Sequence, residues 1–241
     1  MARIFLAGAS GLIGQQLVKL LVRAGHQVTG TTRTESRAEL LRALGAAPAV
    51  VDVYDAEALE RLVVAQRPEI VLHQLTSLPD NLFSLEGADQ ERALRENARM
   101  RIEGTANLVS AASASGARRL VAQSILWIYA PGPEPHLESD PVNVEAQGLL
   151  GVTVRGVVAL ERAVLGAPMQ AVVLRNGSLY GPGTGRDAPM RDPSVHVDAA
   201  ARAAFLAVER GSGVYNVADA GKYASSEKAR RELGWEAAFR L

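Results

Sequence analysis

Hydrophobic residues along the chain fall into short runs that alternate with longer amphipathic segments. The short aliphatic runs predict strands, and the segments with apolar residues three and four positions apart predict helices. The expected strands span residues 3–7, 27–31, 49–53, 69–73, 119–123 and 170–174, and the expected helices span 13–24, 35–44, 56–65, 87–114 and 152–165. Strands and helices that alternate in this order form an α/β fold, a parallel doubly wound sheet with right-handed crossovers.

Two proline- and glycine-rich segments each follow a predicted strand. Residues 131–143 contain four prolines, and residues 181–193 begin Gly-Pro-Gly-Thr-Gly. Proline lacks the N–H that a helix or a sheet requires, so both segments are predicted to be loops. In parallel sheets of this kind, ligands bind at the carboxyl edge, beyond the strand ends. We therefore expect both loops to lie beside a ligand site.

The first predicted strand leads directly into a glycine-rich turn and then into an amphipathic helix. In a Rossmann fold, glycines here permit a sharp turn, let the backbone approach a pyrophosphate and let the helix pack close to the strand. The sequence thus predicts dinucleotide binding, although a generic turn between strand and helix is the alternative. The residues of this turn that we assign to the cofactor are Gly8, Ser10, Gly11, Leu12, Ile13 and Gly14.

The end of the second predicted strand bears on which dinucleotide binds. A fold that prefers NAD usually places a carboxylate there for the ribose 2′-hydroxyl, but this chain has Thr32 and Arg33, with Arg37 one turn further on. A guanidinium holds phosphate through two charge-assisted hydrogen bonds, which favours NADP over NAD. Asp52 and Val53 are expected to end the third strand beside the adenine. For Asp52, a helix cap or a loop carboxylate is the alternative interpretation.

Composition narrows the classes of partner. The chain has 26 basic and 26 acidic residues, so nothing indicates nucleic acid or a membrane surface. It has no cysteine, which excludes disulfides and thiol catalysis, and no cluster has metal-ligand spacing. No signal peptide or membrane-spanning run is recognisable. We therefore expect a cytoplasmic protein with a small-molecule substrate and no metal, and a homodimer stays open.

These motifs, in this order, resemble the extended short-chain dehydrogenase/reductase superfamily, in its NAD-dependent epimerase/dehydratase group. The resemblance covers nearly the whole chain and rests on residues 8–14, 52–53, 68–73, 103–108, 172–175, 179–183, 196–198, 214–217 and 227–235. It implies a Rossmann domain over residues 1–175 and a small C-terminal substrate subdomain over residues 176–241. It also adds Leu75 and Asn97 to the expected cofactor-binding residues.

The catalytic motif of that family is missing. Its members use Tyr-x-x-x-Lys, in which the lysine lowers the pKa of the tyrosine so that the phenol can exchange a proton. No tyrosine in this chain has a lysine four positions later, and alignment on Glu161 places Thr153 and Val157 at the two positions. Residues 125–127 read Ile-Leu-Trp, so the Thr-Asp-Glu cluster of sugar-nucleotide dehydratases is also absent.

Ser124 and Tyr129 are the remaining catalytic candidates, because both follow the fifth predicted strand, where the nicotinamide is expected. Ser124 would hydrogen-bond a substrate carbonyl or the cofactor amide; the alternative is a cap of the strand end. For Tyr129 the alternative is packing beside Trp127. His73 is expected to be a buried, hydrogen-bonded histidine.

The sequence therefore predicts an NAD(P)-binding, epimerase/dehydratase-like oxidoreductase that acts on a small carbonyl or sugar-derived substrate. The missing Tyr–Lys pair leaves an alternative, a catalytically silent NADP-binding sensor or regulatory protein. Two segments, from Gly183 to His196 and from Asn216 to Glu227, are short beside the family. They indicate either a reduced substrate lid or residues missing from within the chain.

Overall fold

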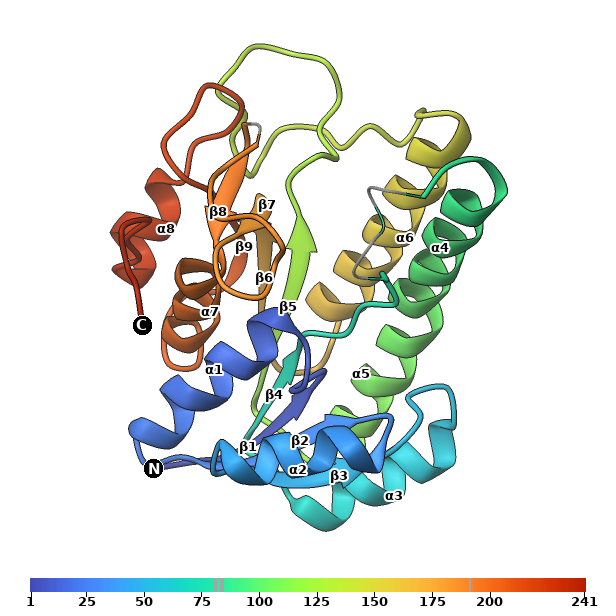
Figure 1. The fold of residues 1–241 in the computed structure, drawn as a ribbon, viewed down its shortest axis with the longest axis vertical. Coiled ribbons are helices and arrows are strands. Elements are labelled where there is room, and N and C mark those ends of the chain that lie inside the picture. Colours follow the sequence, from blue (N-terminus) through green and yellow to red (C-terminus); the bar gives the residue numbers. More distant parts are fainter. Residues whose placement is uncertain (80–81, 83–84, 191) are drawn as a thin grey trace.

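The predicted α/β order is confirmed in the computed structural model, which describes residues 1–79, 82, 85–190 and 192–241 (Figure 1). Seven parallel strands form one sheet in the order β3-β2-β1-β4-β5-β6-β9. The strands are β1 (Arg3–Ala7), β2 (Gln27–Thr32), β3 (Ala47–Val50), β4 (Ile70–His73), β5 (Arg119–Ile125), β6 (Gln170–Asn176) and β9 (Gly213–Val217). The central strands are buried on both faces, which is why they appear in the sequence as continuous apolar runs.

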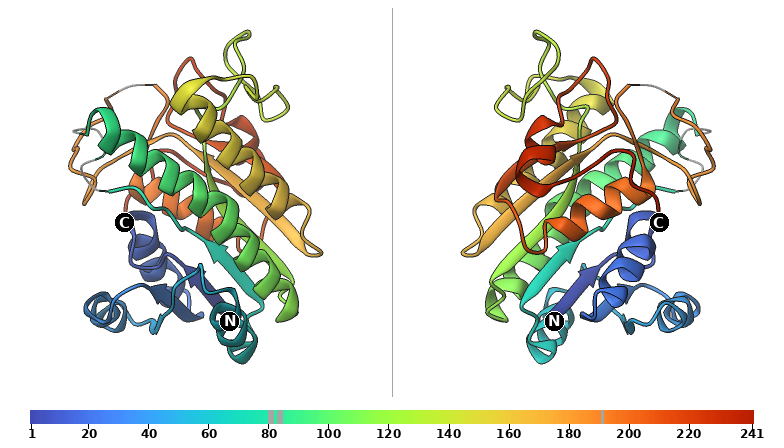
Figure 2. Two further views of the ribbon diagram at one scale, coloured as in Figure 1. Left: turned by 90° about the vertical axis from the view of Figure 1, so that its right-hand side faces the viewer. Right: turned by 90° about the vertical axis from the view of Figure 1, so that its left-hand side faces the viewer.

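Helices cover both faces of the sheet (Figure 2). α1, α2 and α7 pack on one face, and α3, α5 and α6 pack on the other, with α4 against α6. The helices are α1 (Leu12–Arg23), α2 (Glu35–Ala43), α3 (Ala56–Gln66), α4 (Gly87–Arg99), α5 (Thr105–Ala114), α6 (Gly148–Leu165), α7 (Val197–Leu206) and α8 (Glu227–Leu233). Among the described residues, no helix combines the length and the apolar character needed to cross a membrane.

The long helix predicted over residues 87–114 is interrupted by one π-helical turn. α4 runs into η2 (Met100–Gly104), and α5 continues directly from it. A Cβ on Gly104 would lie 2.7 Å from Met100 Sδ and 3.3 Å from a methyl of Val53. The glycine therefore lets the wide turn pack against the sheet, and π turns of this kind often mark functional sites.

The third strand ends earlier than the sequence predicted. β3 stops at Val50, so Asp52 and Val53 lie in the turn that follows and do not end the strand. The Asp52 carboxylate accepts a hydrogen bond from the backbone N–H of Tyr54 at 2.9 Å. This local Asx turn competes with strand pairing and ends the strand.

The C-terminal part of the chain adds elements to the main sheet and beside it. β7 (Ser178–Tyr180) and β8 (Ser194–His196) form a separate two-stranded parallel sheet. β9 then joins the edge of the main sheet next to β6. The segment after residue 176 thus contributes both to the sheet and to the structure above its carboxyl edge.

Candidate functional site

Two of the three glycines in the turn after β1 are required by the fold. Gly8 has a φ of +84°, and a Cβ there would lie 2.5 Å from the Gln74 carbonyl oxygen. A Cβ on Gly14 would lie 2.3 Å from the Gly8 carbonyl oxygen. Gly11 differs, because its Cβ would meet only that oxygen, at 3.3 Å. Packing explains Gly8 and Gly14, whereas a Cβ on Gly11 would make this one tight contact and would otherwise face space that a ligand backbone or phosphate can approach.

The N-terminus of α1 faces this open space without a cap. Gly11 is the N-cap residue, no side chain in the described part of the chain caps the helix, and its first turn holds no acidic residue. The turn is braced from β2, because Gly8 N–H donates to Thr31 Oγ1 at 3.1 Å and Ser10 Oγ donates to Thr32 Oγ1 at 3.3 Å. Free N–H groups and the helix dipole make such an end an anion-binding site.

Arginines lie beyond the end of β2, where an adenosine phosphate is expected. Arg33 and Arg37 are exposed, and neither side chain makes a hydrogen bond or ion pair with any residue that the structure describes. Burial raises the pKa of Tyr54, and the charges of Arg99 and Arg33 oppose the rise. The Arg99 guanidinium lies 4.2 Å from the Tyr54 ring centre. Arg99 pairs with Glu103, so Arg33 and Arg37 are the guanidinium groups left available here.

Leu75 and Asn97 serve the structure of the loop after β4. Asn97 is buried, and its side-chain oxygen accepts a hydrogen bond from the N–H of Ser77 at 2.9 Å. Leu75 N–H donates to His73 Nδ1 at 3.3 Å, and its carbonyl accepts from Gln123 at 3.4 Å. His73 is buried and hydrogen-bonded, as predicted.

Ser124 and Tyr129 meet in one buried network around an ion pair. Arg175 donates two hydrogen bonds to the Glu161 carboxylate, at 3.0 and 2.7 Å. Ser124 Oγ donates to the same carboxylate at 2.7 Å. Arg175 also donates to the Tyr129 hydroxyl at 2.8 Å, and that hydroxyl donates to the Asn216 side-chain oxygen at 2.6 Å. The network joins β5, β6, β9, α6 and the loop after β5.

Both candidate hydroxyls are therefore occupied within the fold. Burial raises the pKa of Tyr129, and the charge of Arg175 opposes the rise. The phenol is thus protonated at neutral pH, whereas an activated phenol needs a lowered pKa. The Tyr129 ring stacks on His136, with ring centres 4.8 Å apart.

Sequence reasoning missed three buried polar groups, two of them at the carboxyl ends of β4 and β6 and one in the π turn. Among the described residues, neither amide atom of Gln74, directly after β4, has a hydrogen-bond partner, and the side-chain oxygen of Asn176, at the end of β6, also lacks one. Buried amides are normally paired, so these two fit a polar ligand above the carboxyl edge. The third group is the side chain of Arg101, in the π turn. The only sequence signal for Gln74 was its polarity directly after an apolar strand.

Val157 lies where the alignment on Glu161 places it. It is fully buried against Ile128 and Val154, with Ile125 at the end of β5 packed beside them. The residue that this alignment pairs with the family's lysine is therefore apolar and packs in the same cluster as Ile125, at the end of β5.

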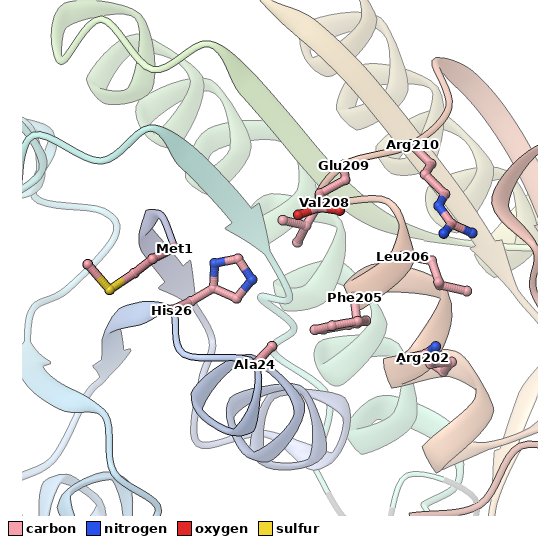
Figure 3. Close-up of a pocket in the computed structure, with 9 residues that line it drawn as sticks. All are labelled: Met1, Ala24, His26, Arg202, Phe205, Leu206, Val208, Glu209 and Arg210. Atoms are coloured by element: carbon pink, nitrogen blue, oxygen red, sulfur yellow. The ribbon is translucent and has the colours of Figure 1, made fainter.

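A pocket at the opposite, amino edge of the sheet contains none of these residues (Figure 3). Its lining includes Met1, His26, Phe205 and Glu209. It lies far along the strands from the glycine turn, which begins at the carboxyl end of β1.

Comparison with known proteins assigns the family. Residues 4–214 match the model of the NAD dependent epimerase/dehydratase family. The chain is 42% identical, over 240 aligned positions, to the 3-diazoavenalumate denitrifying reductase of a Streptomyces species, and the match covers 90% of this chain and 76% of that protein. The alignment spans 240 positions but covers only 90% of the 241 residues of this chain. It therefore contains gaps, at which residues of the relative have no counterpart in this chain.

Solved structures share the fold at low identity. UDP-glucose 4-epimerase of Thermotoga maritima, solved with UDP-glucose, matches with a TM-score of 0.75 and 19% identity, over 99% of this chain and 94% of that one. The Bordetella bronchiseptica enzyme WbmG, solved with NAD and UDP, matches with a TM-score of 0.76 and 18% identity, over 100% and 91%. The chain belongs to the NAD dependent epimerase/dehydratase family and is an NAD(P)-dependent enzyme of the epimerase or reductase type.

Proposed function

We propose that this protein is an NADPH-dependent reductase of a small organic molecule. The observation that carries the proposal is the open, uncapped N-terminus of α1 at Gly11, a glycine that packing does not require. When bound, the reduced cofactor supplies a hydride. The Streptomyces relative, which is named a reductase, supports reduction over epimerisation or dehydration.

The cofactor is assigned along the carboxyl edge of the sheet. The turn from Gly8 to Gly14 holds the pyrophosphate at the N-terminus of α1. Thr32, Arg33 and Arg37 hold the 2′-phosphate, which distinguishes NADP from NAD. The turn at Asp52 and Val53 lies beside the adenine. The nicotinamide half extends toward β4 and β6, where the Gln74 amide and the Asn176 side-chain oxygen lack hydrogen-bond partners among the described residues.

The substrate is assigned to the space between this edge and the C-terminal segment. We propose that residues 176–241 act with the loop 131–143 as the substrate subdomain. Backbone hydrogen bonds already join the two, from His136 N–H to the Tyr223 carbonyl at 2.8 Å and from Ser225 N–H to the His136 carbonyl at 2.9 Å. Loop and subdomain are thus joined to each other on this side of the molecule.

The side chains at the expected acid–base positions favour a substrate that can accept hydride without a strong proton donor. Carbonyl reduction leaves an alkoxide that must be protonated, which is the task of the phenol in the Tyr–Lys pair. This chain has Thr153 and Val157 at those positions, and Tyr129 is engaged by Arg175 and Asn216. An acceptor that already carries positive charge, as a diazo group does once protonated, becomes neutral on gaining hydride. The relative's diazo substrate belongs to this class.

The proposal is tested by following NADPH oxidation with purified protein. Acceptors from three classes are compared: an ortho-diazophenol, a substituted benzaldehyde and UDP-glucose, each with a blank that lacks enzyme. We expect enzyme-dependent oxidation with the diazophenol, less with the aldehyde and none with the sugar nucleotide. Tight NADPH binding without turnover of any acceptor would contradict a reductase and support the sensor alternative.

A further inference from the structure

Arg101 is a buried cation without a partner in the part of the chain that the structure describes. It lies in the π turn η2, and only 7% of it is exposed. Its guanidinium makes no hydrogen bond, ion pair or ring contact with any residue that the structure describes. A guanidinium carries five N–H donors, and leaving it buried and unpaired is strongly unfavourable. Such a group is expected to have a partner that comes from outside the chain.

The topology directs this side chain toward the carboxyl edge of the sheet. α4 follows β4, so the N-terminal end of the α4–η2–α5 helix lies at that edge (Figure 1). Side chains on a helix lean toward its N-terminus. Arg101 also interacts electrostatically with Glu161 on α6 and with His73 on β4. It therefore lies between the long helix, α6 and the end of β4, below the place assigned to the nicotinamide and the substrate.

Among the described residues, neither Glu161 nor His73, the two groups that interact electrostatically with Arg101, neutralises its charge. Glu161 already accepts two hydrogen bonds from Arg175 and one from Ser124. Burial lowers the pKa of His73 to about 4, so this ring is neutral at pH 7. Burial also lowers the pKa of Arg101, to about 10, and the charge of Glu161 opposes that shift. Arg101 is thus protonated at neutral pH, and the site has one uncompensated positive charge.

The cofactor does not supply the missing anion. Its pyrophosphate is assigned to the N-terminus of α1, which packs on the opposite face of the sheet from the π turn. Its 2′-phosphate is assigned to the arginines beyond β2, and the ribose hydroxyls of its nicotinamide half are neutral. The partner of Arg101 is therefore a charged group on the second ligand.

We propose that Arg101 binds an anionic oxygen group, a carboxylate or a phenolate, on the substrate. The inference rests on the proposed function, since it needs a substrate beside the nicotinamide. A guanidinium grips such a group through paired, charge-assisted hydrogen bonds. The substrate is then a small organic anion held by its charged end at the π turn, with its reacting group toward the carboxyl end of β5.

The test measures binding of a charged probe and of its neutral match to the protein saturated with NADP. The probe is 4-fluorobenzoate and the match is 4-fluorobenzamide, both followed by fluorine NMR. We expect the wild type to bind the benzoate and not the benzamide. Arg101→Met weakens benzoate binding at least about tenfold, and Arg101→Lys retains part of it. The control variant is Arg92→Met, which removes an exposed arginine from the same long helix.

Several results would overturn the proposal. They are benzoate binding that is unchanged in Arg101→Met, equal binding of benzamide and benzoate, and no benzoate binding to the wild type at millimolar concentration. An Arg101→Met or Arg101→Lys protein that fails to fold would also count against it, because the guanidinium would then serve the fold. None of these readouts needs turnover, so an enzyme that oxidises no NADPH would defeat the reductase proposal while leaving benzoate binding measurable.

Discussion

Arg175 and Arg101 are two arginines buried to nearly the same extent, with 4% and 7% exposed, and both lie near Glu161. Arg175 holds that carboxylate with two hydrogen bonds and the Tyr129 hydroxyl with another, whereas Arg101 holds nothing among the described residues. Burial alone would lower the pKa of Arg175, but the hydrogen bonds and charge of Glu161 outweigh it and raise that pKa. The difference separates a charge that serves the fold from a charge that awaits a ligand.

The largest expected effect is loss of stability in Arg175→Met. This change leaves Glu161 buried and unpaired, and breaking a buried pair by removing one partner costs about 3–5 kcal/mol. Urea unfolding followed by the fluorescence of buried Trp235 measures the free energy of unfolding. Adding Glu161→Leu should restore part of the loss. A loss below about 1 kcal/mol would mean that the pair contributes no more than a surface ion pair.

Acid should destabilise the fold through His73, which lies beside Arg101. Its pKa is about 4 in the folded protein against 6.5 ordinarily, so the unfolded chain binds the proton more tightly. The stabilisation is complete above pH 6.5 and is lost as the pH falls toward 4, a change of about 3 kcal/mol. Unfolding measured across that range should show a smaller decline in His73→Asn. Arg101→Met should also reduce the decline, because its charge helps to lower the His73 pKa.

The glycine turn also contains one residue that the fold requires, Gly14, and one that is expected to serve the cofactor, Gly11. Gly11→Val should leave the free energy of unfolding nearly unchanged and weaken NADPH binding by at least about 100-fold, or about 2.7 kcal/mol. The branched side chain would occupy the approach to the N-terminus of α1. Gly14→Ala is the matched variant and should fail in folding, because its Cβ would lie 2.3 Å from the Gly8 carbonyl oxygen. Fluorescence of bound NADPH measures the affinity; unchanged binding in folded Gly11→Val would make the turn merely structural.

The exposed arginines beyond β2 are expected to determine which cofactor the protein prefers. NADPH should bind about ten- to a hundred-fold more tightly than NADH, because a hydrogen bond to a charged group contributes about 1.5–3 kcal/mol. Arg33→Met should remove most of this preference and leave NADH affinity unchanged. Calorimetric titration with both cofactors measures it. Equal affinities in the wild type would remove the role assigned to Arg33.

Much of the fold followed from the sequence, because buried parallel strands are continuous apolar runs bounded by amphipathic helices. The end of β3 was misplaced, since the apolar run continues past Val50 and only the Asx turn at Asp52 ends the strand. The short strands β7 and β8 lack enough residues to show a period. Strands this short can be identified only from the structure, where β7 and β8 pair with each other.

The site was predictable in its location and less so in its chemistry. Gly8 and Gly14 belong to a glycine turn that is recognisable in the sequence, although the contact that requires Gly8 comes from Gln74, far away in the chain. The Glu161–Arg175 pair joins residues from α6 and β6, and Arg175 also binds Tyr129 on a loop. These residues are distant in the sequence, and no local pattern predicts that they come into contact. Arg101 was invisible for another reason: it follows Arg92, Arg95 and Arg99 on one helix, and only the packing distinguishes the buried member from the exposed ones.

The most direct measurement is the free energy of unfolding of Arg101→Met without any ligand, compared with that of Arg175→Met. Replacing an unpaired buried charge with an apolar side chain of similar length should leave stability unchanged within about 1 kcal/mol or raise it. The same substitution at Arg175 should cost several times that amount. A loss in Arg101→Met as large as that in Arg175→Met would contradict the account, because both arginines would then serve the fold.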